Sequence, residues 1–159
     1  MTTYMVNIIS GKKDSGKTAK MEKLFRETIN AAGFVSIKVY KDGRVIGYNV
    51  VNLRGGYPVP LARIRGNEPE NWNKKVMHGK FSFSTEGFAA AETIVRRALK
   101  ENAENIFLDE IGKLELKGKG FAPLLKYLLT EDIHLYIAVR SENVVSVVNQ
   151  FGINNYRIS

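Results

Sequence analysis

The chain has no cysteine, two histidines and four prolines among its 159 residues. The lack of cysteine excludes disulfide bonds and thiolate metal sites. His78 and His134 show no metal-ligand spacing, so we interpret both as structural residues. The sequence also lacks an apolar run of about 20 residues, the length that spans a bilayer, and a basic start followed by a long apolar stretch. We therefore expect no membrane-spanning helix and a cytoplasmic location.

The composition is that of an ordinary soluble globular protein, with 44% hydrophobic and 25% charged residues. Its length suits one core, so we predict a single domain over residues 1–159. The formal net charge is +8. This charge fits a lysine-rich solvated surface, phosphorylated ligands or a nucleic acid. The basic residues are spread along the chain, so the charge alone does not select a partner.

Short apolar segments alternate with helical patterns along the chain. Strands are predicted at residues 4–9, 34–40, 45–53, 81–83, 105–110, 133–139 and 153–159, and helices at residues 16–32, 85–102, 121–129 and 141–150. Gly33 and Gly152 are interpreted as helix stops, and Ser84 or Thr85 as a helix cap. Residues 54–80 hold several glycines and prolines and are expected to form loops and short strands.

This alternation predicts an α/β fold, a mainly parallel sheet with helices on both faces. The Asp-Gly pair at residues 42–43 predicts a β-hairpin between the strands at 34–40 and 45–53. The hairpin would add antiparallel strands at one edge of the sheet. Ligands of such sheets bind at the carboxyl ends of the strands, where the predicted site should lie.

The segment GKKDSGKT, from Gly11 to Thr18, has the pattern G-x-x-x-x-G-K-T between a predicted strand and a predicted helix. Backbone N–H groups of such a loop converge on phosphate oxygens, and Gly16 lets the backbone approach them closely. Lys17 is predicted to contact the β- and γ-phosphates, and the Thr18 hydroxyl to bind Mg²⁺. A glycine-rich turn with an incidental lysine is the alternative, but the complete motif in this context favours phosphate binding.

Four residues fill the variable positions of this loop and belong to the predicted nucleotide site: Lys12, Lys13, Asp14 and Ser15. Lys13 is a candidate for a second phosphate contact, although solvation of both lysines is the simpler interpretation. Asp14 is unusual beside a polyphosphate, so we expect its side chain to point outward.

The segment IFLDE at residues 106–110 predicts the second half of the site. Its apolar strand delivers Asp109 to the carboxyl edge of the sheet, where the carboxylate can hold Mg²⁺ directly or through water. Glu110 can orient or deprotonate a water aimed at the γ-phosphate. A solvated acidic strand end is the alternative. The candidate catalytic residues are thus Lys17 and Glu110, and the candidate metal ligands are Thr18 and Asp109.

The longer segment DEIGKLEL, at residues 109–116, resembles the extended Walker B signature of the P-loop nucleoside-triphosphatases first described from thermophiles. That family includes the human cancer-related nucleoside-triphosphatase. Residues 47–53 and 60–63 resemble the family's hairpin and the arginine-bearing segment after it, so the resemblance extends from residue 8 to about residue 115. It implies a RecA-like core and slow hydrolysis of nucleoside triphosphates with broad base tolerance. The family's loop usually carries prolines and a further glycine at positions 12–14.

We interpret the chain as a Mg²⁺-dependent enzyme that hydrolyses ATP, GTP and other nucleoside triphosphates to the diphosphate and phosphate. A nucleotide or small-molecule kinase is the first alternative, with residues 54–80 as its lid or acceptor pocket. A non-catalytic nucleotide-binding module is the second. GKKDSGKT is also similar to the loop of the P-loop protein of molybdopterin-guanine dinucleotide biosynthesis, a family that does not predict DEIGKLEL. A nucleic-acid motor is suggested by the charge alone.

Further side chains are weaker candidates. An arginine can stabilise transferred-phosphate charge, or it can be a surface residue; this applies to Arg54, Arg63 and Arg65. Arg140 ends a predicted core strand and is a candidate sensor of the γ-phosphate. Lys113 and Glu115 form either a local ion pair or a solvated pair. Tyr57 and Trp72 can stack on a base, but packing is the simpler interpretation.

Overall fold

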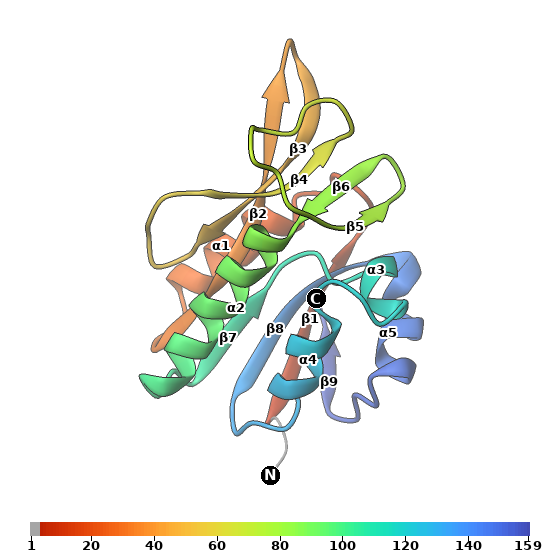
Figure 1. The fold of residues 1–159 in the computed structure, drawn as a ribbon. Coiled ribbons are helices and arrows are strands. Elements are labelled where there is room, and N and C mark those ends of the chain that lie inside the picture. The colour runs from red at the N-terminus through yellow and green to blue at the C-terminus, as the bar shows by residue number, and fades with distance from the viewer. Residues whose placement is uncertain (1–3) are drawn as a thin grey trace.

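The computed structural model describes residues 4–159, which form strands and helices around one sheet (Figure 1). The strands are β1 (Met5–Gly11), β2 (Ala31–Lys41), β3 (Arg44–Asn52), β4 (Val59–Ile64), β5 (Lys74–His78), β6 (Phe81–Ser84), β7 (Asn105–Leu108), β8 (His134–Arg140) and β9 (Tyr156–Ile158). The helices are α1 (Lys17–Arg26), α2 (Thr85–Lys100), α3 (Lys113–Leu116), α4 (Ala122–Leu128) and α5 (Val144–Gln150), with a 3-10 turn η1 (Ser141–Asn143) before α5. No helix within residues 4–159 is long and apolar enough to cross a membrane.

The sheet has two halves that meet at β2. Its strand order is β5-β6-β4-β3-β2-β7-β8-β1-β9. From β2 to β9 the neighbouring strands pair in parallel, whereas β3, β4, β6 and β5 extend the other side of β2 in antiparallel pairs. The predicted α/β class with a parallel core is confirmed. The antiparallel part goes beyond the predicted hairpin, because β4, β6 and β5 continue it.

Helices cover both faces of the sheet, as predicted. Successive residues of a strand point to opposite faces, so Ile8 packs in the larger core with residues of α2, α4 and α5, and Ile9 packs in the smaller core under α1. Phe34 and Val35 of β2 divide between the two cores in the same way. Burial on both faces explains why the central strands are continuous apolar runs in the sequence.

The first helix is shorter than the predicted range of residues 16–32. It ends at Arg26, and β2 begins at Ala31. Alanine favours helices, but Ala31 is buried beside β7, so tertiary packing overrides its propensity. Gly33 is a strand residue with a φ of 142° and not a helix stop. A Cβ atom there would lie 2.1 Å from the carbonyl oxygen of Phe107, so the close approach of β2 and β7 requires glycine.

The segments from β2 to the start of α2 agree with the predicted pattern in most places. The hairpin of β2 and β3 is confirmed, with positive φ at Asp42 and Gly43 in its turn. Ser84 caps α2 by accepting the N–H of Gly87 at 2.9 Å, as expected. Residues 54–80 contain two short strands, β4 and β5, between loops.

Three differences concern the segments after β7. The predicted strand at residues 105–110 is wrong in its last part, because β7 ends at Leu108 and both acidic residues follow it. The one-turn helix α3 was not predicted; it is too short to show an apolar period. The predicted helix at residues 141–150 begins as the 3-10 turn η1.

Candidate functional site

The carboxyl ends of three parallel strands meet at one edge of the sheet. β1 leads at Gly11 into the glycine-rich loop, β7 leads into Asp109 and Glu110, and β8 ends at Arg140. Gly11 and Arg140 are partners in the register of β1 and β8, so the loop begins directly beside Arg140. Parallel pairing thus brings together two motifs that lie far apart in the sequence.

The glycine-rich loop joins β1 to α1 through a backbone that needs glycine. Gly16 precedes α1 with a φ of 86°, which is left-handed, and no side chain caps the helix. The first amides of α1 therefore point toward the loop without a side-chain acceptor. The Lys17 ammonium lies over the loop and donates to the carbonyl oxygens of Lys12, at 2.7 Å, and Gly11, at 3.4 Å.

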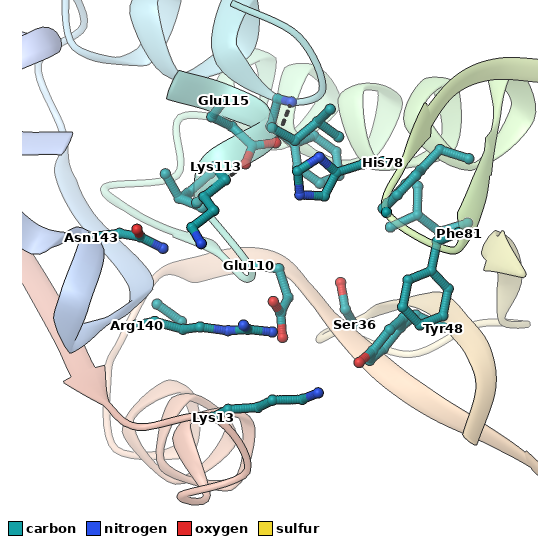
Figure 2. Close-up of a pocket in the computed structure, with 18 of the residues that line it drawn as sticks. Lys13, Ser36, Tyr48, His78, Phe81, Glu110, Lys113, Glu115, Arg140 and Asn143 are labelled. Carbon is teal, nitrogen blue, oxygen red and sulfur yellow. Dashed lines mark hydrogen bonds between the residues drawn. The ribbon is translucent and has the colours of Figure 1, made fainter. Parts of the chain in front are cut away.

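The variable positions of the loop differ in direction. Asp14 has a φ of 59°, and its carboxylate binds the ammonium of Lys38 on β2. This hydrogen bond and the charge of Lys38 lower the pKa of Asp14. The expectation that Asp14 points outward is met, since its side chain is 53% exposed. Lys13 points into a cavity beside the loop (Figure 2).

Asp109 is buried at the end of β7, where it connects the two motifs. One carboxylate oxygen, Oδ2, accepts the Thr18 hydroxyl at 2.9 Å and the backbone N–H of Ser36 at 3.0 Å, and Oδ1 accepts the N–H of Glu110 at 2.9 Å. Burial above all, and then the charge of Glu110, raises the pKa of Asp109 to about 6. The hydrogen bonds fix its orientation toward the start of α1.

Glu110 follows Asp109 with its side chain directed away from the core. Its φ is 60°, a left-handed conformation that costs a residue other than glycine about 1–2 kcal/mol. This backbone turns the side chain into the cavity, which Arg140 and Lys13 also line (Figure 2). Such local strain is typical of residues whose direction matters for function.

A cavity of about 310 Å³, which we call the edge cavity, lies between the loop and the antiparallel half of the sheet (Figure 2). Its lining has a polar side beside the loop and an apolar side toward β4, β6 and α3. The polar side includes Lys13, Lys17, Ser36, Tyr48, Glu110 and Arg140, and the apolar side includes Leu61, Phe81, Phe83, Ile111, Leu114 and Phe121. The cavity is open enough for a small molecule and is contiguous with the loop.

Glu115 forms neither the local ion pair with Lys113 nor the solvated pair that the sequence suggested. It is 2% exposed, so it is not a solvated residue, and its carboxylate binds backbone amides instead of Lys113. It accepts the N–H groups of Gly112 at 2.8 Å and Phe121 at 2.9 Å. Burial raises the pKa of Glu115 to about 7. The residue joins α3 to the start of α4 and thereby holds one wall of the edge cavity.

None of the three candidate arginines of the irregular region, Arg54, Arg63 and Arg65, lines the edge cavity. Arg54 donates to the carbonyl oxygen of Ala31, at the end of β2 away from the loop, and its Nη1 lies 3.7 Å from Oε1 of Glu101. Arg63 is neither at the surface nor free to bind a ligand, because it is buried and donates to β3 and β4. Arg65 pairs its backbone N–H with Lys80. Of the candidate arginines, Arg140 is the one that lines the edge cavity.

The remaining aromatic and histidine candidates divide into two groups. Trp72 donates to the Ser82 hydroxyl at 2.9 Å and has a packing role, whereas Tyr57 is 96% exposed, so the packing interpretation is wrong for it. His134 packs against Tyr4 at the start of β8, far from the loop. His78 lines the edge cavity.

Sequence reasoning did not identify Ser36 or Tyr48 as residues that line the cavity. Ser36 is 4% exposed, and among residues 4–159 its hydroxyl is the buried side-chain polar atom that has no hydrogen-bond partner. A serine within the apolar segment FVSIKVY was the signal that could have identified it. Tyr48 points its hydroxyl toward the cavity (Figure 2), but one tyrosine in an alternating strand carries no such signal.

Comparisons with known proteins agree with this geometry. The family model described as NTPase matches residues 7–157 of the chain. The nucleoside-triphosphatase THEP1 of Pyrobaculum aerophilum is 30% identical over 148 residues, which cover 91% of this chain and 79% of that protein. The protein of the same name from Archaeoglobus fulgidus is 26% identical over 131 residues, which cover 80% of this chain and 73% of that protein.

Two solved structures share the fold. The crystal structure of THEP1 from the hyperthermophile Aquifex aeolicus has a TM-score of 0.71 at 22% identity and covers 97% of this chain and 88% of its own. The solution structure of a human cancer-related nucleoside triphosphatase has a TM-score of 0.68 at 21% identity, with coverages of 97% and 87%. Because the family model spans nearly the whole chain and the Pyrobaculum relative matches over most of both sequences, this chain belongs to the NTPase family.

Proposed function

We propose that this protein hydrolyses nucleoside triphosphates to the diphosphate and phosphate. The observation that carries the proposal is the 2.9 Å hydrogen bond from the Thr18 hydroxyl to Asp109 Oδ2. It joins the first turn of α1 to the end of β7, which is the arrangement that phosphate loops need for metal and phosphate binding. Membership of the NTPase family and the names of the curated relatives support the same activity.

In this proposal the phosphates bind across the glycine-rich loop, Gly11–Thr18. The free amides of the loop and of the first turn of α1 donate to phosphate oxygens. Lys17, whose ammonium already lies over the loop, exchanges carbonyl oxygens of the loop for β- and γ-phosphate oxygens. Lys13 and Arg140 line the same edge and supply further positive charge toward the γ-phosphate.

The donor set at this edge fits Mg²⁺. The Thr18 hydroxyl and the Asp109 carboxylate are hard oxygen ligands, which Mg²⁺ prefers. Within residues 4–159 no group of three or more histidine or acidic side chains could hold a metal ion, so a bound Mg²⁺ would also need phosphate and water ligands. When bound, Mg²⁺ supplies positive charge that neutralises the phosphate oxygens. Such a metal-nucleotide substrate also fits the cytoplasmic location that we propose.

Glu110 is the residue that we assign to the water nucleophile. Its left-handed backbone directs the carboxylate into the edge cavity, next to the position of the γ-phosphate. There it orients a water and accepts its proton as the phosphorus–oxygen bond forms. Asp109 is engaged by three hydrogen bonds and so is not available for this role.

The test compares the wild-type protein with Glu110→Gln. The variant keeps the shape of the side chain and loses its basicity, so phosphate release should slow by about 10²–10⁴-fold, the usual contribution of a positioned general base. Binding of the Mg²⁺-nucleotide should change little, because Lys17, Thr18 and Asp109 remain. Steady-state phosphate release and equilibrium binding are measured on one preparation, with Glu142→Gln on η1 as the control. Binding without turnover in the wild-type protein would favour a non-catalytic nucleotide-binding module.

A further inference from the structure

The edge cavity is larger and more apolar than hydrolysis by a single water requires. On the side away from the loop its wall consists of Leu61 of β4, Phe81 and Phe83 of β6, and Phe121 before α4. Leu61 and Phe121 are 3% and 4% exposed and belong to the larger core, so this wall is preformed. A preformed apolar cavity of about 310 Å³ fits the ring of a small organic molecule.

One buried polar group in the cavity lacks a partner. Ser36 is 96% buried, and its hydroxyl has no hydrogen-bond partner within residues 4–159. The backbone N–H of Ser36 donates to Asp109. The hydroxyl points toward the centre of the cavity (Figure 2). A buried hydroxyl without a partner costs about 1–3 kcal/mol, and a ligand hydroxyl in the cavity would remove that cost.

The rim of the cavity is positively charged on the side that the nucleotide does not occupy. Lys113 points into the cavity (Figure 2). Lys80 also lines the cavity, with its ammonium 5.6 Å from the centre of the Phe81 ring. Burial lowers the pKa of His78, and the positive charges of Lys117, Lys113 and Arg140, which give this region a positive potential, lower it further. An anionic substituent on the ligand complements that potential.

The position of the cavity relative to the loop defines what a ligand there can do. Lys17 and Glu110 line the cavity, so it opens at the γ-phosphate end of the nucleotide. The base lies at the other end of the triphosphate chain, so we expect it to bind outside this cavity. A molecule in the cavity therefore faces the phosphorus atom that reacts.

We propose that the edge cavity binds a second substrate, a ring-bearing alcohol with an anionic substituent, which receives the γ-phosphoryl group in place of water. The proposal rests on the proposed function, because the same loop must hold the triphosphate. The alcohol oxygen forms a bond to the γ-phosphorus, and the bond from that phosphorus to the β,γ-bridging oxygen breaks. The nucleoside diphosphate leaves with the electron pair, and the alcohol proton passes to the Glu110 carboxylate.

Three probes test the class of ligand: meta-hydroxymethylbenzoate, benzoate and benzyl alcohol. Each is added to the full chain with Mg²⁺ and a non-hydrolysable nucleotide, and binding is followed by ligand-observed NMR. We expect saturable binding of the two carboxylates and weaker binding of benzyl alcohol, which lacks the anion. With a γ-labelled triphosphate, label should pass to meta-hydroxymethylbenzoate, whereas benzoate should inhibit that transfer. Absence of saturable binding of both carboxylates would overturn the proposal, and binding without label transfer would overturn the assigned reaction.

Two variants locate the binding. Ser36→Ala should weaken binding of meta-hydroxymethylbenzoate by about tenfold, the usual effect of one lost hydrogen bond, and the exposed Ser146→Ala is its control. His78→Trp fills the mouth of the cavity and should lower the ratio of transfer to hydrolysis by more than about tenfold. His134→Trp, at the opposite edge of the sheet, should leave this ratio unchanged. Equal binding by all four variants would mean that the probes bind elsewhere.

The same samples separate this proposal from the proposed function. Phosphate release without any probe measures hydrolysis and does not involve the acceptor. If hydrolysis proceeds but no probe binds, the acceptor proposal fails alone. If His78→Trp weakens nucleotide binding instead of probe binding, the cavity holds the base and the proposal is wrong. If neither nucleotide binding nor hydrolysis is seen, the proposed function itself fails.

Discussion

The two halves of the sheet differ in how they contribute to the candidate site. The parallel half, from β2 to β9, ends at one edge with charged and hydroxyl side chains on short loops. The antiparallel half, formed by β3, β4, β6 and β5, supplies apolar side chains of β4 and β6 to the other wall of the edge cavity, which is completed by residues that follow β7. The polar groups on one side are suited to the reaction, and the apolar wall on the other side is suited to choosing which ligand binds. Changes in the parallel half should alter nucleotide binding, and changes in the antiparallel half should alter stability and ligand fit.

After Glu110→Gln, the variant expected to show the largest difference between an effect on nucleotide binding and an effect on stability is Lys17→Ala. Loss of a charge-assisted contact should weaken nucleotide binding by on the order of 1.5–3 kcal/mol. Stability should hardly change, because the ammonium is near the surface and binds only loop carbonyls among residues 4–159. Titration with a fluorescent nucleotide measures the affinity, and the exposed Lys20→Ala on α1 is the control. Unchanged affinity in Lys17→Ala would contradict the assignment.

Glu115, which lies in the wall of the edge cavity, can be tested through the pH dependence of stability. Its pKa is raised from an ordinary 4.5 to about 7 by burial, so the folded state binds a proton that the unfolded state has already lost in this pH window. Stability relative to Glu115→Gln should therefore fall as the pH rises from about 4.5 to 7, by about 3 kcal/mol in total. Denaturant unfolding of both proteins at several pH values measures this difference. A difference that is independent of pH would show that Glu115 is not buried in this way.

The parallel half could be predicted in detail because its signals are local. GKKDSGKT and IFLDE each combine a strand pattern with side chains of defined chemistry, and their meeting at one edge follows from parallel pairing. The end of α1 was missed because Ala31 has the wrong local preference and is held in β2 by its neighbours. The roles of site residues in that half stay predictions until variants are measured.

The antiparallel half could be predicted only in outline. Its hairpin has a local signal, the turn at Asp42 and Gly43, but the order of β4, β6 and β5 depends on contacts distant in sequence. Arg63 looked like a surface or phosphate-binding residue, and its burial against β3 carries no sequence signal. The apolar cavity wall likewise comes from β4, β6, residues 111–114 and Phe121, so no single pattern reveals it.

Ser84 provides a test within the antiparallel half. Its hydroxyl accepts the N–H of Gly87 at 2.9 Å and donates to the carbonyl oxygen of Pro60 at 2.7 Å, so it ties the start of α2 to β4. Ser84→Ala should lower the free energy of unfolding by about 1–2 kcal/mol, because it removes a cap and leaves both partners unpaired. Nucleotide affinity should be unchanged. A loss of affinity equal to that of Lys17→Ala would break the proposed division between the halves.

The smallest expected effect concerns Asp14, where the loop contacts β2. The Asp14–Lys38 pair is largely exposed, so Asp14→Asn should change stability by less than about 1 kcal/mol. The same change removes a negative charge beside the triphosphate and frees Lys38, so nucleotide binding should become a few-fold tighter at low ionic strength. Salt screens such exposed charges, and the gain should disappear at high salt. Fluorescent-nucleotide titrations at two salt concentrations measure it, with Asp132→Asn, near the opposite edge, as the control. Tightening that persists at high salt would mean that Asp14 acts through the shape of the loop and not through its charge.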